Sequence, residues 1–162
     1  MKPWKQRPRE IRNLFNPSFC GVVLSRALEG YESEEEEGMP FSVSLLILPL
    51  SLHKETRESF LAGSRSYFAK IIETNPQILV GFSDRAKGLM PYSLEALGYL
   101  MNYGAISVTD SGNIKLVPKG VRKTITGTDE SKACQSVAKT IGKKLAVIND
   151  RVTIYTSLGV RP

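Results

Sequence analysis

The stretch PYSLEALGYLMNYGAISVTDSGNIKLV, residues 91–117, carries the strongest secondary-structure signals in the chain. Pro91 opens a run with helical apolar spacing, and Gly104 stands where a C′ glycine ends a helix. The residues that follow alternate in polarity on both sides of a turn at Asp110–Asn113, which predicts a β-hairpin over Ala105–Val117. We therefore expect a helix that is followed directly by a hairpin.

The N-terminal part of the chain is expected to be helical as well. Pro8–Leu14 is typical of a short helix with one apolar side. Asn16-Pro17 is a start signal, because Asn caps a helix and Pro suits its first position, and we expect this helix to end at Gly30. Tyr31–Gly38 contains a run of glutamates, and like charges at this density predict an exposed, mobile loop.

The middle of the chain carries weaker signals. Periodicity does not separate a strand from a buried helix for the apolar run Phe41–Leu50, and we favour a helix because no second strand-like run lies nearby. The segment Ser51–Gly63 stays ambiguous. Ser64 is a candidate cap for a helix that reaches about residue 74, and Asn75-Pro76 repeats the earlier start signal and predicts another helix.

The C-terminal part completes the predicted fold. Asp129–Val147 is typical of an amphipathic helix, and Asn149 or Asp150 caps a last helix that Gly159 closes. The predicted order of elements is typical of a winged helix-turn-helix: two short helices and a third helix, followed at once by a hairpin. The predicted fold class is mainly α: a winged helix-turn-helix-like domain with one β-hairpin and flanking helices.

We divide the chain into three parts that together form one compact domain. Residues 1–30 are an N-terminal arm and helix, residues 31–38 are the acidic loop, and residues 39–162 are a winged-helix-like core with C-terminal helices. A chain of 162 residues is long enough to bury a core without metals or disulfides.

Composition and motifs argue against most catalytic chemistry. One histidine and two cysteines cannot supply a four-ligand zinc site without carboxylates, and no glycine-rich phosphate loop is present. His53 could act as a general base beside a neighbouring glutamate. A structural histidine is favoured instead, because no nucleophile or oxyanion donor is identifiable. We expect no enzyme activity, no cofactor and no bound metal.

The cysteines and the apolar runs indicate the compartment. Cys20 and Cys134 are 114 positions apart near apolar helix faces, so we expect both to be buried free thiols in a reducing cytoplasm. The longest apolar run, Val43–Leu50, is far shorter than the roughly 20 residues that cross a bilayer, and we expect no membrane partner.

The formal net charge is +6, and the distribution of cations and aromatic residues indicates the kind of partner. The helix 91–103 holds no Lys or Arg, and its outer face with Tyr99 and Tyr103 suits protein contact better than base readout. Trp4 lies in a stretch that cannot bury it locally, so it must fold back or anchor on a partner. Four cations could contact the DNA backbone or form a solvated basic face: Lys115, Lys119, Arg122 and Lys123.

Several motifs along nearly the whole chain resemble those of one known family. They are Lys2–Trp4, Arg7–Ile11, Asn13–Pro17, Phe19–Gly21, Gly38–Phe41, Leu48-Pro49, Leu52–Lys54 with Thr56-Arg57, and the closing Ile154–Pro162. These sequence motifs are similar to those of the middle components of three-component ABC systems. These are small bacterial proteins encoded between an effector and an SMC-like ABC ATPase, as in Lamassu-type anti-phage systems.

The resemblance implies a non-enzymatic adaptor. It would link the SMC-like ATPase, which senses DNA, to a nuclease-type effector in a defence complex, with only non-specific DNA contact through the complex. The partner-binding residues that we expect are Trp4, Arg7, Arg9, His53, Arg57, Tyr99 and Tyr103. The alternative is a winged-helix DNA-binding regulator, which would bind a specific duplex by itself. An enzyme centred on His53 is a distant third.

Overall fold

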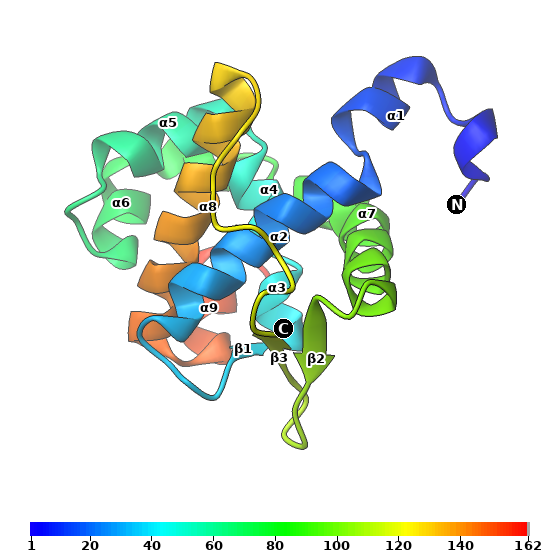
Figure 1. Cartoon of the computed structure of the whole chain (residues 1–162). Helices are drawn as coiled ribbons and strands as arrows, with labels where there is room; N and C mark the ends of the chain where they lie inside the picture. Colours follow the sequence, from blue (N-terminus) through cyan, green and yellow to red (C-terminus); the bar gives the residue numbers. More distant parts are fainter. Residues whose placement is uncertain (162) are drawn as a thin grey trace.

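Two long helices, α2 and α8, pack against each other along the centre of the molecule and organise the fold (Figure 1). The structure is a computed structural model and describes residues 1–161. It is mainly helical, as expected. The helices are η1 (Trp4–Gln6), α1 (Arg9–Leu14), α2 (Pro17–Glu32), α3 (Phe41–Ser44), α4 (Ile47–Ser51), α5 (Lys54–Ala62), α6 (Phe68–Thr74), η2 (Pro76–Leu79), α7 (Phe82–Asn102), α8 (Asp129–Ile148) and α9 (Arg151–Ser157). The strands are β1 (Met39–Pro40), β2 (Ile106–Val108) and β3 (Asn113–Leu116).

The backbones of α2 and α8 touch where each helix contributes a glycine. A Cβ atom added to Gly142 of α8 would overlap the carbonyl oxygen of Ala27 in α2. A Cβ atom added to Gly30 of α2 would overlap the carbonyl oxygen of Lys139 in α8. We predicted that Gly30 ends this helix, and that prediction was wrong. Gly30 allows α8 to approach α2, and α2 continues to Glu32.

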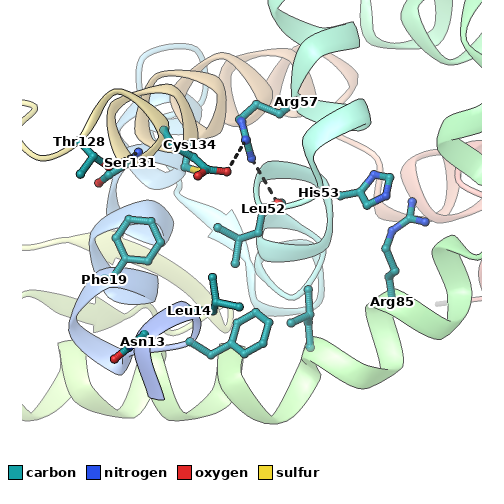
Figure 2. Close-up of a pocket in the computed structure, with 13 residues that line it drawn as sticks. Asn13, Leu14, Phe19, Leu52, His53, Arg57, Arg85, Thr128, Ser131 and Cys134 are labelled. Atoms are coloured by element: carbon teal, nitrogen blue, oxygen red, sulfur yellow. Dashed lines mark hydrogen bonds and ion pairs between the residues drawn. The ribbon is translucent and has the colours of Figure 1, made fainter. Parts of the chain in front are cut away.

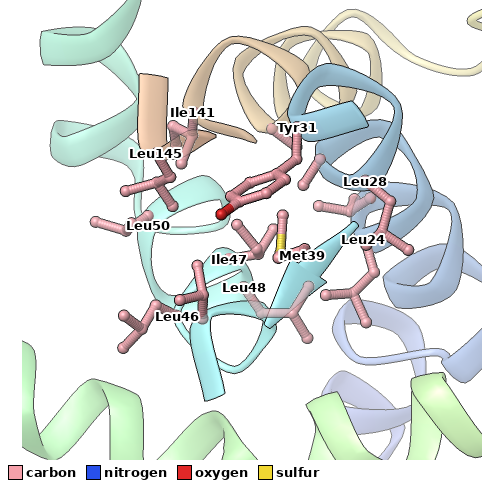
Figure 3. Packing of buried hydrophobic residues seen from close by; sticks show 14 of the residues in the cluster. Leu24, Leu28, Tyr31, Met39, Leu46, Ile47, Leu48, Leu50, Ile141 and Leu145 are labelled. Atoms are coloured by element: carbon pink, nitrogen blue, oxygen red, sulfur yellow. The ribbon is translucent and has the colours of Figure 1, made fainter. Parts of the chain in front are cut away.

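The core fills the space between α2, α4 and α8 (Figure 3). The buried residues drawn there include Leu24, Leu28, Tyr31, Met39, Leu46, Ile47, Leu48, Leu50, Ile141 and Leu145. Burial raises the pKa of the Tyr31 phenol to about 12, so this side chain stays protonated inside the core. The apolar face predicted for α8 is confirmed, because Cys134, Val137, Ala138, Ile141 and Leu145 are all buried.

The predicted hairpin is present and belongs to a larger sheet. β2 and β3 pair antiparallel, with Val108 opposite Ile114, and β1 adds Met39 opposite Ile114 on the other side. The order of the sheet is β1-β3-β2. β1 was not predicted, because a two-residue strand has no alternation to detect.

We predicted that a new helix starts at Pro91, and that prediction was wrong. Pro91 lies inside α7, which runs without interruption from Phe82 to Asn102. A proline in a helix leaves the carbonyl four residues earlier without its donor. Lys87 and Pro91 are both exposed, so water can satisfy that carbonyl. The separate third helix of a winged helix-turn-helix is thus not formed at Pro91, and the winged-helix assignment remains a prediction.

The acidic segment 31–38 is only partly the exposed loop that we predicted. Tyr31 is 1% exposed and Gly38 is buried. Three of the glutamates have partners in the fold: Glu32 accepts from the Leu116 amide at 2.6 Å, Glu34 pairs with Lys143 at 3.0 Å, and Glu35 accepts from Asn149 at 2.7 Å. The cations and amides that meet this run come from β3, from α8 and from the residue that follows α8.

Three further predicted helix boundaries differ in the structure. The apolar run 41–50 is helical, as favoured, but in two short pieces, α3 and α4. The helix predicted from Ser64 begins only at Phe68, because the Nζ of Lys144 donates hydrogen bonds to the carbonyl oxygens of Ser64 and Ser66. Asn75-Pro76 opens only the single turn η2, and Gly81 at φ +64° separates it from α7.

The remaining elements agree with the local signals. The ambiguous segment 51–63 contains α5, and Asn16 caps α2 by accepting from the Ser18 amide at 2.9 Å. Of the two caps considered for the last helix, Asp150 serves, and it accepts from the Val152 amide at 2.9 Å. No helix in the described part of the chain has both the length and the apolar character that crossing a bilayer requires.

Candidate partner-binding site

A cavity of about 530 Å³ lies where α1, α2, α5, α7 and α8 approach one another (Figure 2). Its lining is Asn13, Leu14, Phe15, Phe19, Leu52, His53, Arg57, Arg85, Leu89, Thr128, Glu130, Ser131 and Cys134. His53 and Arg57, which the sequence singled out, are therefore brought to one site. The other expected partner-binding residues lie elsewhere.

Arg57 is a buried cation that the fold holds in place. Its guanidinium donates to the carbonyl oxygens of Ser51 and Leu52 at 3.3 and 3.2 Å. It also donates to Glu130 at 3.1 Å, and the Arg57 side chain is 6% exposed. The Arg57 guanidinium is thus largely buried, and Glu130 is its one charged partner among the described residues.

His53 caps the N-terminus of α5. Its Nδ1 accepts from the Thr56 amide at 3.4 Å and lies 2.9 Å from the Thr56 hydroxyl. Burial lowers the pKa of His53, and the nearby Arg85 and Arg57 lower it further against a smaller opposing effect of Glu55. This arrangement supports the structural interpretation of His53 over the general-base interpretation.

We expect acid to weaken this cap. Because the folded pKa of His53 lies below its ordinary value of 6.5, the unfolded chain binds the proton more readily. The stabilisation is complete above pH 6.5 and is lost as the pH falls through the lowered pKa. His53→Asn keeps a preferred cap residue that does not titrate. Wild type should therefore lose more stability than His53→Asn between pH 7 and pH 5.5 in denaturant melts, and equal losses would contradict the assignment.

A second cavity, of about 570 Å³, lies beside the first and contains the tyrosine pair. Phe19 and Ser131 line both cavities. The rings of Tyr99 and Tyr103 have centroids 4.7 Å apart, and Tyr103 is 73% exposed. Arg122 lines the same cavity, so the structure joins one of the four candidate DNA-contacting cations to the tyrosine pair.

The N-terminal arm, residues 1–15, lies at one end of the molecule beside α7 (Figure 1). Arg7 makes a bidentate pair with Glu95 at 2.7 Å and is 8% exposed, and its guanidinium lies 5.3 Å from the ring of Trp4. The hydrogen bond with Glu95 raises the pKa of Arg7. Trp4 is half-buried beside Arg7, and of the three arm residues expected to bind a partner only Arg9 is exposed.

The loop between β3 and α8 carries the remaining basic candidates. Lys119, Arg122 and Lys123 are exposed, whereas Lys115 is half-buried on β3. Sequence reasoning missed Arg26, which holds this loop: its side chain is 4% exposed and donates to the carbonyl oxygens of Arg122 and Thr124 at 2.7 and 3.1 Å. No local pattern marks an arginine inside an apolar helix as a partner of a loop 96 positions away.

The burial expected for the two cysteines is confirmed. Both are buried free thiols. Burial raises the pKa of Cys20 to about 12 and also raises the pKa of Cys134. No group of three or more His, Cys, Asp or Glu side chains that could hold a metal occurs within residues 1–161.

The fold and its surfaces define a small helical protein with two adjoining open cavities, one lined by a tyrosine pair and one by a buried arginine. The comparison with protein families is specific. A family model described as ABC-three component (ABC-3C) system Middle Component 3 matches residues 4–162, and the chain belongs to this family. Comparisons with curated proteins and with solved structures gave no significant match.

Proposed function

We propose that this chain is a non-enzymatic adaptor that links an SMC-like ABC ATPase to a nuclease-type effector in a bacterial defence complex of the Lamassu type. It would act in the cytoplasm against phage or plasmid DNA, and the ATPase would sense that DNA. The observation that carries the proposal is membership of a middle-component family over residues 4–162. A middle component belongs to a system with further subunits, and an adaptor must offer a surface to them.

The tyrosine pair is the surface that suits the ATPase contact best. Tyrosine is enriched at protein interfaces because it supplies a large, stiff contact area with a polar end. Tyr103 is largely exposed, and Tyr99 stacks beside it at the edge of a cavity that an anchor from the partner can enter. Residues 91–103 around them carry no Lys or Arg for a DNA groove, and the cations of α7, Arg85 and Lys87, lie in its first two turns.

Tyr99→Ala/Tyr103→Ala should weaken binding to the ATPase. Central aromatic contacts of this kind contribute about 2 kcal/mol or more, so we expect roughly 30-fold weaker binding. The measurement is the affinity for the purified ATPase encoded with this chain. Tyr67→Ala is the matched control, because Tyr67 is 78% exposed and lies in the connection between α5 and α6.

Two results would contradict the proposal. In the first, the wild type binds neither of the other subunits at micromolar concentration. In the second, the tyrosine variant and Tyr67→Ala bind equally well. Melting temperatures must be compared throughout, since a loss of binding counts only where the variant melts like the wild type.

One observation favours the alternative, a DNA-binding regulator of the winged-helix type. Lys119, Arg122 and Lys123 are exposed beside the hairpin, and no ion pair within the described residues neutralises them. A regulator would shift one defined duplex at physiological salt, whereas an adaptor would bind DNA weakly and with steep salt dependence. An electrophoretic titration at two salt concentrations separates these outcomes.

A further inference from the structure

The cavity beside Arg57 is apolar at its centre, and its lining holds one more cation than carboxylates. Its apolar lining is Leu14, Phe15, Phe19, Leu52 and Leu89. Figure 2 shows Arg57 apart from His53 and Arg85, which lie next to each other, and Arg57 pairs with Glu130. Glu130 is the only carboxylate in the lining, so the two arginines outnumber it.

The charge partner of Arg57 is weakly held. The Arg57 guanidinium is buried, and one of its nitrogens is occupied by two carbonyl oxygens. The other pairs only with Glu130, whose side chain is 77% exposed. An ion pair with such an exposed partner contributes at most about 1 kcal/mol. A carboxylate from another molecule that also excludes water from Arg57 would gain more from the same cation.

Arg85, the second cation of the cavity, has a hydrogen-bond donor that no group within residues 1–161 accepts. Arg85 donates to the carbonyl oxygens of Val80 and Ile78 at 2.6 and 2.8 Å, while its Nε is buried without a partner within residues 1–161. Burial, Arg85 and Arg57 all lower the pKa of His53, and Glu55 raises it.

The mouth of the cavity is open to a partner. Leu14 lines the cavity yet is 60% exposed, and α1, which carries it, has no buried residue. A six-residue helix without a buried face gains little stability from its own backbone. A volume of about 530 Å³ is within the range of sites that bury a large part of a ligand.

We propose that this cavity docks a segment of a protein partner that inserts a large apolar side chain and supplies a carboxylate, which replaces Glu130 on Arg57. The occupant follows from charge complementarity: apolar walls select the anchor, and the surplus of cations selects an acidic neighbour. The proposal rests on the adaptor function, since it takes the partner from the other subunits of the system. It adds a second contact, separate from the tyrosine pair.

Glu130→Gln removes the competing carboxylate and should tighten binding. We expect roughly 3- to 10-fold higher affinity for the subunit that carries the acidic segment, measured against both purified subunits. Glu73→Gln is the matched control, because Glu73 is an equally exposed carboxylate in an ion pair with Lys70. Unchanged or weaker binding by a Glu130→Gln protein that melts like the wild type would overturn the proposal.

A second pair of variants keeps the test informative if Glu130→Gln is unstable. Leu14→Glu and Leu14→Lys remove the same apolar side chain at an exposed position, but they bring opposite charges to the mouth of the cavity. Leu14→Glu should bind at least about 10-fold more weakly than Leu14→Lys, because its carboxylate competes for the cations and repels an acidic segment. Equal affinities would overturn the proposal.

His53 supplies a readout that a structural role of Arg57 would not change. It is the only histidine in the chain, so its ring signals are unambiguous when this chain alone carries labelled histidine. An occupant of the cavity should change the ring signals of His53 in the complex, whereas unchanged signals would overturn the proposal. If the wild type binds neither subunit, the adaptor function itself fails. If it binds and the charge variants behave alike, only the cavity assignment fails.

Discussion

Gly142→Ala should lower the free energy of unfolding by about 3 kcal/mol or more, the largest effect that we expect from a single methyl group in this chain. The added Cβ would overlap the backbone of Ala27, and a backbone carbonyl cannot rotate away as a side chain can. The helices α2 and α8 must then separate along the contact that holds the core together. For a chain of this length, the melting temperature should fall by roughly 6–12 °C.

Gly98→Ala is the control for this result. Gly98 lies inside α7, and a Cβ added there meets nothing within 4 Å. Alanine is the better helix former, so this variant should gain about 0.5–1 kcal/mol. Thermal melts of the two variants should therefore move in opposite directions. A Gly142→Ala protein as stable as the wild type would show that α2 and α8 do not touch as described.

Gly30→Ala tests the same contact from the other helix. It should be as damaging as Gly142→Ala, because its Cβ would overlap the backbone of Lys139. The double variant should lose less stability than the sum of the two single losses, since helices that are already apart do not clash again. Full additivity would mean that the two glycines act at independent places.

Arg26→Met should release the loop between β3 and α8 and lower the free energy of unfolding by about 2–4 kcal/mol. Methionine keeps the length and the apolar stem of the side chain but cannot donate to the carbonyl oxygens of Arg122 and Thr124. It also ends the contact of Arg26 with the amide oxygen of Gln135 at 3.4 Å, beside α8. Hydrogen exchange of residues 121–126 should quicken more than exchange in α8.

Two further variants separate the guanidinium from the loop side chains. Arg26→Lys should restore only part of the lost stability, because one ammonium group does not reproduce the fork of a guanidinium. Arg122→Ala should leave stability and loop exchange unchanged, since Arg26 binds the backbone of residue 122 and the Arg122 side chain is exposed. If Arg122→Ala loosens the loop as much as Arg26→Met does, the side chain of Arg122 holds the loop.

The elements with local signals were predicted well. The cap at Asn16, the hairpin over 105–117 and the amphipathic helix before Asn149 depend on residues a few positions apart, and all are present. The helix boundaries predicted at Pro91 and Gly30 were wrong because both residues lie inside longer helices. Each is a typical helix boundary residue, yet solvent exposure tolerates the first inside α7, and contact with α8 requires the second inside α2.

The candidate site was predicted only in part. The sequence marked His53, Arg57, Tyr99 and Tyr103, and the structure places them at two adjoining cavities. It did not mark Glu130, Arg85 or Arg26, because the role of each depends on a neighbour far along the chain or on the course of a loop. Arg7 was expected at a partner surface, and its pair with Glu95 had no signal in the sequence.

The sequence by itself determined that the chain is mainly helical, where most of its helices and its hairpin lie, and that residues 91–103 carry no cation for DNA. These properties follow from caps, periodicity and composition, which act within a few residues. Only the tertiary structure decided the contact of α2 with α8, the third strand and both cavities. Arg57 and Glu130 are 73 positions apart, and Arg7 and Glu95 are 88 apart. No periodic pattern spans such distances, so their pairing depends on how the helices pack.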